Sequence, residues 1–308
     1  MSIDSYIQQF GKLKVNKRGE HESPHKPCMV LAVIGMAEAG LLKENKIYFM
    51  PPLLDRYLEI FNIVKTETDH PNPYFPFFHL RSERFWHLSP KKERSAVLEA
   101  MSTARSYADI TDNIEYAYLD PELYDGLKNA ITRSDLRAYL ITRWLGSYGK
   151  KLQGILDQDQ YEKNLRDSVE TGIKELPVKE YEKAARDTAF RRIVTEAYDY
   201  RCAASGKRIV LPGDIVMVEA AHLIPFSETH DDDPRNGIAL TPDYHWALDR
   251  NIIAPGPDYR WHISKMVDER IADNRPLVEL DGKELILPRD KRFWPREDAL
   301  KSRLQSLK

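Results

Sequence analysis

Apolar residues recur at helical spacing through the first half of the chain. From Pro27 to Ala39 and from Pro52 to Val64 they fall three or four positions apart, which predicts two helices, each with one buried face. Gly40 follows the first of them as a typical C-terminal cap. The same reasoning predicts helices over 91–105, 121–130 and 134–148, and short strands over 47–49 and 110–118. The first half is therefore expected to be mostly helical, with small strand pieces.

The pattern differs in the second half. A helix predicted over 178–198 precedes an apolar, β-branched run over 216–224, which predicts a strand that stops at Pro225. An acidic loop then ends in Asn236-Gly237, a tight-turn signal, before a short strand over 238–240. Thr241-Pro242 is typical of a helix start, and this helix should end near Asp249. The order is thus strand, loop, strand, helix. Two hairpins are predicted after it, over 252–263 and 277–287.

A length of 308 residues suggests two domains. Residues 150–180 are polar and charged and carry only a weak helix signal over 161–168. We therefore assign an N-terminal domain to 1–165, a linker to 166–185 and a C-terminal domain to 186–308. The fold class is α+β.

Composition narrows the setting. The formal net charge is −2, which is compatible with a local basic patch on the protein that binds nucleic acid. Two cysteines in a chain of this length predict a reducing compartment without a disulfide framework. No apolar run is long enough to span a bilayer. We expect a cytoplasmic protein without membrane contact.

Four polar residues fall at the joints of the strand–loop–strand–helix pattern. His222 lies near the end of the first strand and Asn236 at the turn, while His245 and Asp249 share one face of the helix. An imidazole and a carboxylate can hold a divalent cation, and a second imidazole can take a proton from water. Taken singly, a strand histidine is usually structural and a helical His-Asp pair is usually solvated. Their order along this pattern favours metal-assisted phosphodiester hydrolysis.

This stretch resembles the HNH, or ββα-metal, nucleases over residues 186–264. The similarity lies in Glu219-Ala-Ala-His222, in Asn236-Gly237 and in His245-Trp-Ala-Leu-Asp249, at spacings of 14 and 9 residues. It implies that His222 is the general base, that Asn236 fixes the loop and orients the base, and that His245 is a metal ligand. Oxygen-rich ligation favours Mg²⁺ or Mn²⁺, and the imidazole also admits Co²⁺, Ni²⁺ or Zn²⁺.

The chain departs from those nucleases at two positions. Ala221 stands where many relatives carry a ligand just before the base, so we expect Asp249, Glu219 or water to complete the metal shell, with Asp249 favoured. Ser205 follows Cys202 at the spacing where many relatives carry a second cysteine for a structural zinc. A four-ligand zinc site is therefore not expected.

Aromatic rings and cations alternate over residues 72–88. Such interleaving suits stacking and phosphate contact, although an aromatic mini-core is equally compatible with the rings. For His79, Arg81 and Arg84 we favour DNA contact, since guanidinium groups are seldom buried unpaired. A basic run over 12–18 is either a solvated helix end or a phosphate contact.

Residues 5–165 resemble the sulfur-binding domain of phosphorothioate-dependent restriction endonucleases. The similarity lies in Pro24-His25-Lys26-Pro27 and in the stretch from Pro73 to Leu88. It implies that Phe75, Pro76 and His79 line an apolar cup for the sulfur, with His25 and Lys26 beside it. Sulfur is larger and less strongly hydrated than oxygen, so an apolar wall favours it over an ordinary phosphate oxygen.

Together the two resemblances imply a modification-dependent endonuclease that binds phosphorothioate-modified double-stranded DNA and cuts nearby. Cutting both strands needs two sites, so a homodimer is expected. Two alternatives stay open. The N-terminal domain could instead read a methylated base, or the nuclease centre could have decayed, leaving a DNA-binding protein. Ala221 is the feature that favours decay.

Overall fold

The computed structural model describes residues 3–172, 183–211 and 215–308. They form two compact units, the first reaching Lys163 and the second beginning at Asn164. Of the linker expected at 166–185, residues 173–182 lie outside the described residues, as does the start of the helix expected at 178–198. The weak helix signal over 161–168 belongs to a much longer helix, α9 (Gly149–Thr171). Among the described residues, no helix is both long and apolar enough to cross a membrane.

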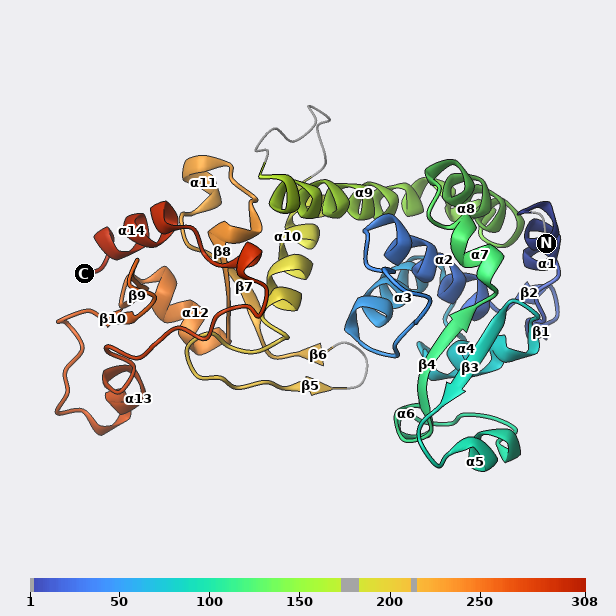
Figure 1. Ribbon diagram of the computed structural model, residues 1–308, viewed down its shortest axis with the longest axis horizontal. Coiled ribbons are helices and arrows are strands. Elements are labelled where there is room, and N and C mark those ends of the chain that lie inside the picture. The colour runs from blue at the N-terminus through green and yellow to red at the C-terminus, as the bar shows by residue number, and fades with distance from the viewer. Residues whose placement is uncertain (1–2, 173–182, 212–214) are drawn as a thin grey trace. The chain divides into compact units, whose positions relative to one another are not determined.

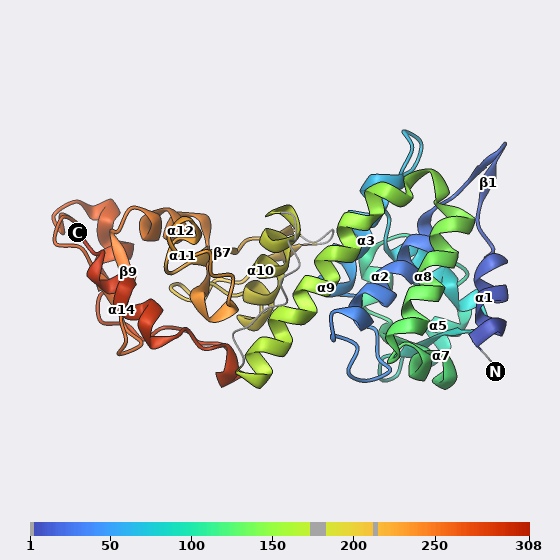
Figure 2. The ribbon, with the colours of Figure 1, turned by 90° about the horizontal axis from the view of Figure 1, so that it is seen from above.

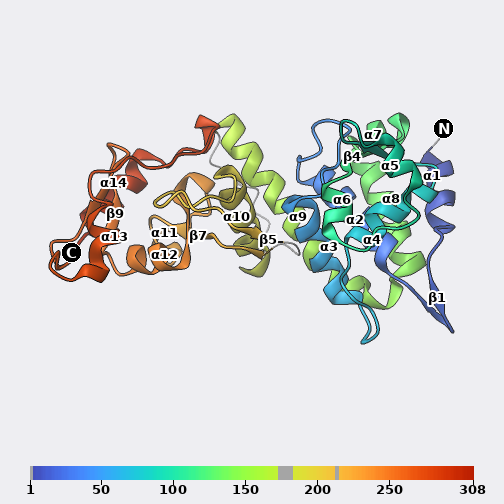
Figure 3. The ribbon, with the colours of Figure 1, turned by 90° about the horizontal axis from the view of Figure 1, so that it is seen from below.

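Helix α2 (His25–Glu38) forms the centre of the first unit. Nearly all its residues are buried, as expected for a helix that is apolar on every side. It packs against α3 (Pro51–Val64) and α8 (Ala130–Trp144), and α1 (Ile3–Gly11) packs on α8 (Figure 2). Helix α4 (Tyr74–His79) also contacts α2 (Figure 3).

Two small antiparallel sheets complete this unit. Strand β3 (Trp86–Pro90) pairs with β4 (Ile114–Leu119), and the indole of Trp86 donates to the Phe77 carbonyl at 3.0 Å, which ties the sheet to α4. The strand predicted at 47–49 is a single bridge from Ile47 to Ala117. The other elements are β1 (Lys17–Arg18), β2 (His21–Glu22), η1 (Leu80–Ser82), α5 (Ser95–Ala100), α6 (Tyr107–Thr111), α7 (Pro121–Gly126) and η2 (Gly146–Tyr148).

A buried ion cluster joins α3 to α9. The guanidinium of Arg56 is almost fully buried and donates to Asp159 Oδ1 at 3.0 Å and to Glu162 Oε2 at 2.6 Å. Charges removed from water in this way stabilise a fold only while their hydrogen bonds are kept. The cluster therefore fixes the part of α9 up to Lys163 within the first unit.

In the second unit, strands β7 (Glu219–His222) and β8 (Gly237–Leu240) form an antiparallel hairpin with His222 opposite Gly237. The hairpin lies between α10 (Lys183–Ala197) and α12 (Pro242–Asp249) (Figure 1). The predicted strand–loop–strand–helix order is therefore present. The strand predicted over 216–224 is divided into β6 (Ile215–Val216), which pairs with β5 (Val210–Leu211), and β7.

Of the two hairpins predicted after this motif, the first is present as β9 (Ile253–Pro255) and β10 (Trp261–Ile263). The second prediction is wrong. Residues 275–278 form helix α13 (Arg275–Val278), because Pro276 suits a helix start and Arg275 pairs with Glu279 one turn later. The remaining elements are α11 (Phe226–Thr229), η3 (Pro234–Asn236), η4 (Ala272–Asn274), η5 (Lys291–Phe293) and α14 (Glu297–Gln305).

Gly237 allows α10 to approach the hairpin. A Cβ at this position would lie 2.5 Å from Val194 Cγ2 and 2.8 Å from Phe190 Cζ, which is closer than real Cβ contacts. The space that a side chain would occupy is thus taken by Val194 and Phe190 of α10.

We expect Arg56→Met to lower the free energy of unfolding of the first unit by about 3–5 kcal/mol, because it leaves the buried carboxylates of Asp159 and Glu162 without this guanidinium. Urea denaturation followed by circular dichroism measures the change. Lys128→Met, which removes the exposed pair with Asp125, is the control and should leave the midpoint unchanged. Equal effects of both variants would contradict a stabilising role for the cluster.

We expect Gly237→Ala to cost about 1–3 kcal/mol, because the added methyl group forces α10 away from the hairpin. Thermal denaturation measures it. Gly154→Ala is the matched control, since a Cβ there meets no described atom within 4 Å and alanine favours the helix. An unchanged melting temperature for Gly237→Ala would show that α10 can shift without cost.

Candidate DNA-binding pocket and nuclease centre

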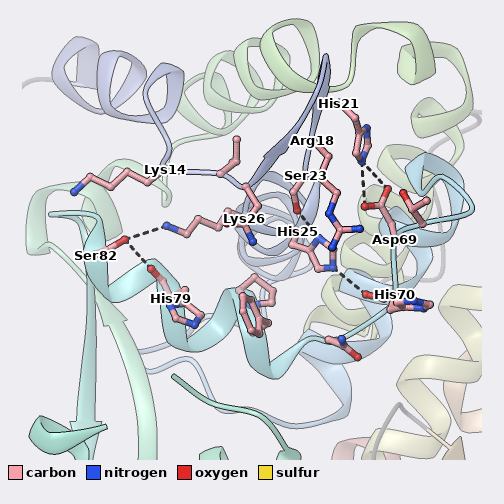
Figure 4. Close-up of a pocket in the computed structure, with 16 residues that line it drawn as sticks. Lys14, Arg18, His21, Ser23, His25, Lys26, Asp69, His70, His79 and Ser82 are labelled. Atoms are coloured by element: carbon pink, nitrogen blue, oxygen red, sulfur yellow. Dashed lines mark hydrogen bonds and ion pairs between the residues drawn. The ribbon is translucent and has the colours of Figure 1, made fainter. Parts of the chain in front are cut away.

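A pocket of about 420 Å³ opens in the first unit between the start of α2, helix α4, the β1–β2 hairpin and the 68–72 loop (Figure 4). Five of the seven residues predicted to bind DNA or sulfur line it: His25, Lys26, Phe75, Pro76 and His79. Residues 50 positions apart in the sequence are thus brought to one cavity.

The part of the pocket formed by α4 is aromatic and apolar. Pro76 is buried, and the rings of Phe75 and His79 lie 4.5 Å apart. Burial, with the nearby charges of Lys26 and Arg81, lowers the pKa of His79, whose Nε2 lies 3.1 Å from Thr103 Oγ1. The imidazole is therefore neutral at pH 7, and this wall carries no formal charge.

The charge of Lys26 is compensated within the protein. Its Nζ lies 2.5 Å from Glu83 Oε1 and 3.0 Å from Ser82 Oγ, and its side chain is largely buried. Burial lowers the pKa of Lys26, and the contact with Glu83 opposes that shift. Lys26 therefore offers the pocket an ammonium group that is held in place rather than a free surface charge.

His25 is fixed in one tautomer. Its Nε2 lies 2.8 Å from the carbonyl of His70 and must donate, so Nδ1 accepts from the Ser23 hydroxyl at 2.7 Å. The ring packs edge-on against Phe61, and burial lowers the pKa of His25. Both ring nitrogens thus form hydrogen bonds within the protein, and His25 positions the 68–72 loop through the His70 carbonyl.

The β1–β2 hairpin adds a cationic rim that the sequence indicated only in part. Arg18 belongs to the basic run noted above and lines the pocket with Lys14. His21, which carried no signal, forms an ion pair of 3.0 Å with Asp69 when protonated. His21 is brought to the pocket by the β1–β2 pairing, in which Lys17 lies opposite Glu22. No sequence pattern predicted this pairing.

Arg81 and Arg84 do not line the pocket. Arg81 donates to the carbonyls of Leu98 and Met101, and its guanidinium lies 4.0 Å from the Phe78 ring centroid. It therefore ties η1 to the end of α5. Arg84 is exposed outside the pocket.

In the second unit His222 lies flat against α10. Its ring stacks on Phe190, with centroids 3.9 Å apart and planes 4° from parallel. Its Nε2 lies 3.7 Å from Asp232 Oδ1, and 23% of its side chain is exposed. One edge of the imidazole therefore faces protein while part of it reaches solvent.

Asn236 is completely buried and holds the loop that follows His222. Its Oδ1 accepts from the Ile224 amide at 2.9 Å, and its Nδ2 donates to the carbonyls of Ile224 and Asp231 at 3.0 and 3.2 Å. The two ends of the acidic loop are thereby joined by one side chain.

His245 meets a carboxylate at each ring nitrogen. Nδ1 lies 2.7 Å from Glu219 Oε2, and Nε2 lies 3.6 Å from Asp249 Oδ2. The two carboxylates lie on opposite sides of the ring, so they do not converge on one point. In the described parts of the chain, no group of three or more His, Cys, Asp or Glu side chains is arranged to hold a metal ion. The donor set fits a cation bound by His245 and one carboxylate, with its other ligands from water and phosphate.

The region around Cys202 is held by hydrogen bonds. Its sulfur accepts from the Ser205 amide at 3.5 Å and from the Thr241 hydroxyl at 3.7 Å, and the thiol is buried. Cys28 is also buried and free.

Two family descriptions match the chain. Residues 3–152 match the ScoMcrA-like DNA sulfur-binding domain, and residues 202–254 match the HNH endonuclease family. The first match contains the pocket, and the second contains the ββα motif with His222, Asn236 and His245. No curated protein matches the chain.

Several solved structures are similar at low identity. The sulfur-binding domain of SprMcrA with phosphorothioated DNA is 14% identical over 47% of this chain and 86% of that one, with a TM-score of 0.35. The type IV phosphorothioation-dependent restriction endonuclease ScoMcrA is 10% identical over 79% and 94%, with a TM-score of 0.35. The modification-dependent TagI restriction endonuclease is 18% identical over 42% and 44%, with a TM-score of 0.30. On its family matches, the chain joins an N-terminal ScoMcrA-like DNA sulfur-binding domain to a C-terminal HNH endonuclease domain.

Proposed function

We propose that this protein binds phosphorothioate-modified duplex DNA through the pocket of its first unit and hydrolyses nearby phosphodiester bonds with its second unit. The observation that carries the proposal is the composition of the pocket, where an uncharged wall of Phe75, Pro76 and His79 stands beside cationic side chains. This combination suits a phosphate in which sulfur replaces one oxygen.

The two sides of the pocket have different roles. The apolar wall takes the sulfur atom, because a normal phosphate oxygen would lose its water there without gaining a hydrogen-bond partner. Arg18 and Lys14 attract the remaining negative charge of the backbone, and Lys26, whose charge is paired with Glu83, adds a hydrogen-bond donor in a fixed position. Selectivity and affinity are thereby supplied by separate residues.

In the nuclease centre His222 accepts a proton from the attacking water. Asn236 keeps the loop in place behind it, so the imidazole holds its position. His245 and Asp249 hold a divalent metal, Mg²⁺ or Mn²⁺ in preference to Co²⁺, Ni²⁺ or Zn²⁺, which when bound stabilises negative charge on the phosphate and the leaving oxygen. Glu219 accepts the Nδ1 proton of His245, which directs Nε2 toward Asp249.

We further propose that the enzyme acts as a homodimer in a reducing compartment, the cytoplasm. Two antiparallel DNA strands present two equivalent phosphates, which one centre in each copy can reach. Both cysteines are free thiols, in keeping with that compartment.

We expect the His222→Ala protein to bind a duplex with one Rp phosphorothioate at least about tenfold more tightly than the unmodified duplex, because sulfur gains the apolar contact. Gel shifts at moderate salt measure the ratio. Phe75→Ala and Pro76→Ala should bring the ratio toward one. Arg84→Ala, outside the pocket, is the control and should leave it unchanged.

Equal binding of both duplexes, across several core sequences, would exclude the sulfur pocket. If affinity instead followed base methylation, the first unit would be a reader of methylated DNA.

We expect His222→Ala and His245→Ala each to slow cleavage at least about 100-fold with DNA affinity unchanged, since each removes one group that acts on the reacting phosphate or water. Single-turnover cleavage in Mg²⁺ and Mn²⁺ measures the rate. His262→Ala, which removes an imidazole paired with Asp258 elsewhere in this unit, should cut at the normal rate. Wild-type protein that binds DNA and never cuts it would mark a decayed nuclease.

A further inference from the structure

A buried carboxylate stands behind His222. The Asp232 side chain is 2% exposed, and its Oδ1 lies 3.7 Å from His222 Nε2. The flanking residues Asp231 and Asp233 turn away and bind Arg296 at 2.6 and 3.1 Å. Of three consecutive aspartates, Asp232 is therefore the one directed at the histidine.

The nitrogen that faces Asp232 needs an acceptor. His222 Nε2 is buried and has no hydrogen-bond partner among the described residues. Leaving such a polar atom unpaired is costly, and the carboxylate oxygen Asp232 Oδ1 lies 3.7 Å from it, within ion-pair distance. A carboxylate can only accept, so the proton must be on Nε2.

Helix α10 holds both partners. Phe190 stacks under the His222 ring, and Arg186, one turn earlier, lies 3.8 Å from Asp232 Oδ2. The ring plane and the carboxylate are thus set by one helix face. The ring centroid of Phe226 lies 6.0 Å from that of His222 and 4.8 Å from the Arg186 guanidinium.

We propose that Asp232 is a positioning residue that keeps His222 in the Nε2–H tautomer, so that Nδ1 is the atom that takes the proton from water. The proposal rests on the proposed nuclease function. The water proton moves to Nδ1 as the water oxygen bonds to phosphorus, and the bond to the leaving 3′ oxygen breaks. That oxygen takes a proton from solvent. The resulting imidazolium keeps its Nε2–H on Asp232, and His222 later returns the Nδ1 proton to solvent.

The first test is Asp232→Asn in the full chain. The amide keeps the shape and can donate to Nε2, which favours the wrong tautomer, so single-turnover cleavage should fall about 100-fold or more with the DNA dissociation constant unchanged. Asp232→Glu should recover part of the rate. Asp258→Asn, which alters the Asp258–His262 pair (3.1 Å) elsewhere in this unit, is the control and should cut normally.

The second test reads the tautomer directly. Nitrogen chemical shifts of the His222 ring in protein labelled at histidine should show Nε2 protonated in the wild type, and Nδ1 protonated or a mixture in Asp232→Asn. His222→Ala assigns the resonance.

A wild-type ring protonated at Nδ1 would overturn the proposal, as would an Asp232→Asn protein that cuts at the normal rate. Wild-type protein that fails to cut modified DNA would refute the nuclease function instead, and the ring shifts would still decide the tautomer.

Discussion

The packing of α10 on the β7–β8 hairpin is the contact on which the nuclease centre depends. It is possible because Gly237 has no side chain, so Val194 and Phe190 fill the space opposite His222. Phe190 then supplies the surface on which the imidazole lies. A glycine and a phenylalanine from two other elements thus fix the imidazole ring of His222.

In the first unit, two side chains that line the pocket already make hydrogen bonds to other groups of the protein. The two ring nitrogens of His25 form hydrogen bonds with Ser23 and His70, and the ammonium group of Lys26 donates to Ser82 and Glu83. Because these side chains need no ligand to be ordered, a ligand of this pocket would bind with little loss of conformational entropy. The pocket is therefore formed before any ligand enters it.

The sequence predicted local structure well where periodicity and turn chemistry were strong. The helices around 27–39 and 52–64 and the ββα order are present, since apolar spacing, Asn236-Gly237 and Thr241-Pro242 all act locally. The hairpin expected at 277–287 failed because apolar spacing over so short a run does not separate strand from helix.

For the two sites, the sequence could single out only residues that belong to a motif. Motifs singled out His222 and Pro76, and the structure has Pro76 in the pocket and His222 at the end of β7, while their roles stay predictions. Asp232 could not be singled out from its two acidic neighbours, because only the loop held by Asn236 decides which carboxylate faces the ring. Arg81 shows the converse: its charge suggested DNA, yet its partners are two carbonyl groups of its own unit.

The hydrogen-bonded Cys202 has a practical consequence. The segment before β7 is held by contacts of the Cys202 sulfur with the Ser205 amide and the Thr241 hydroxyl. On the proposed mechanism, a chelator should therefore remove the divalent metal without unfolding this domain. Protein arrested on its DNA by chelation should then resume cutting when the metal is restored.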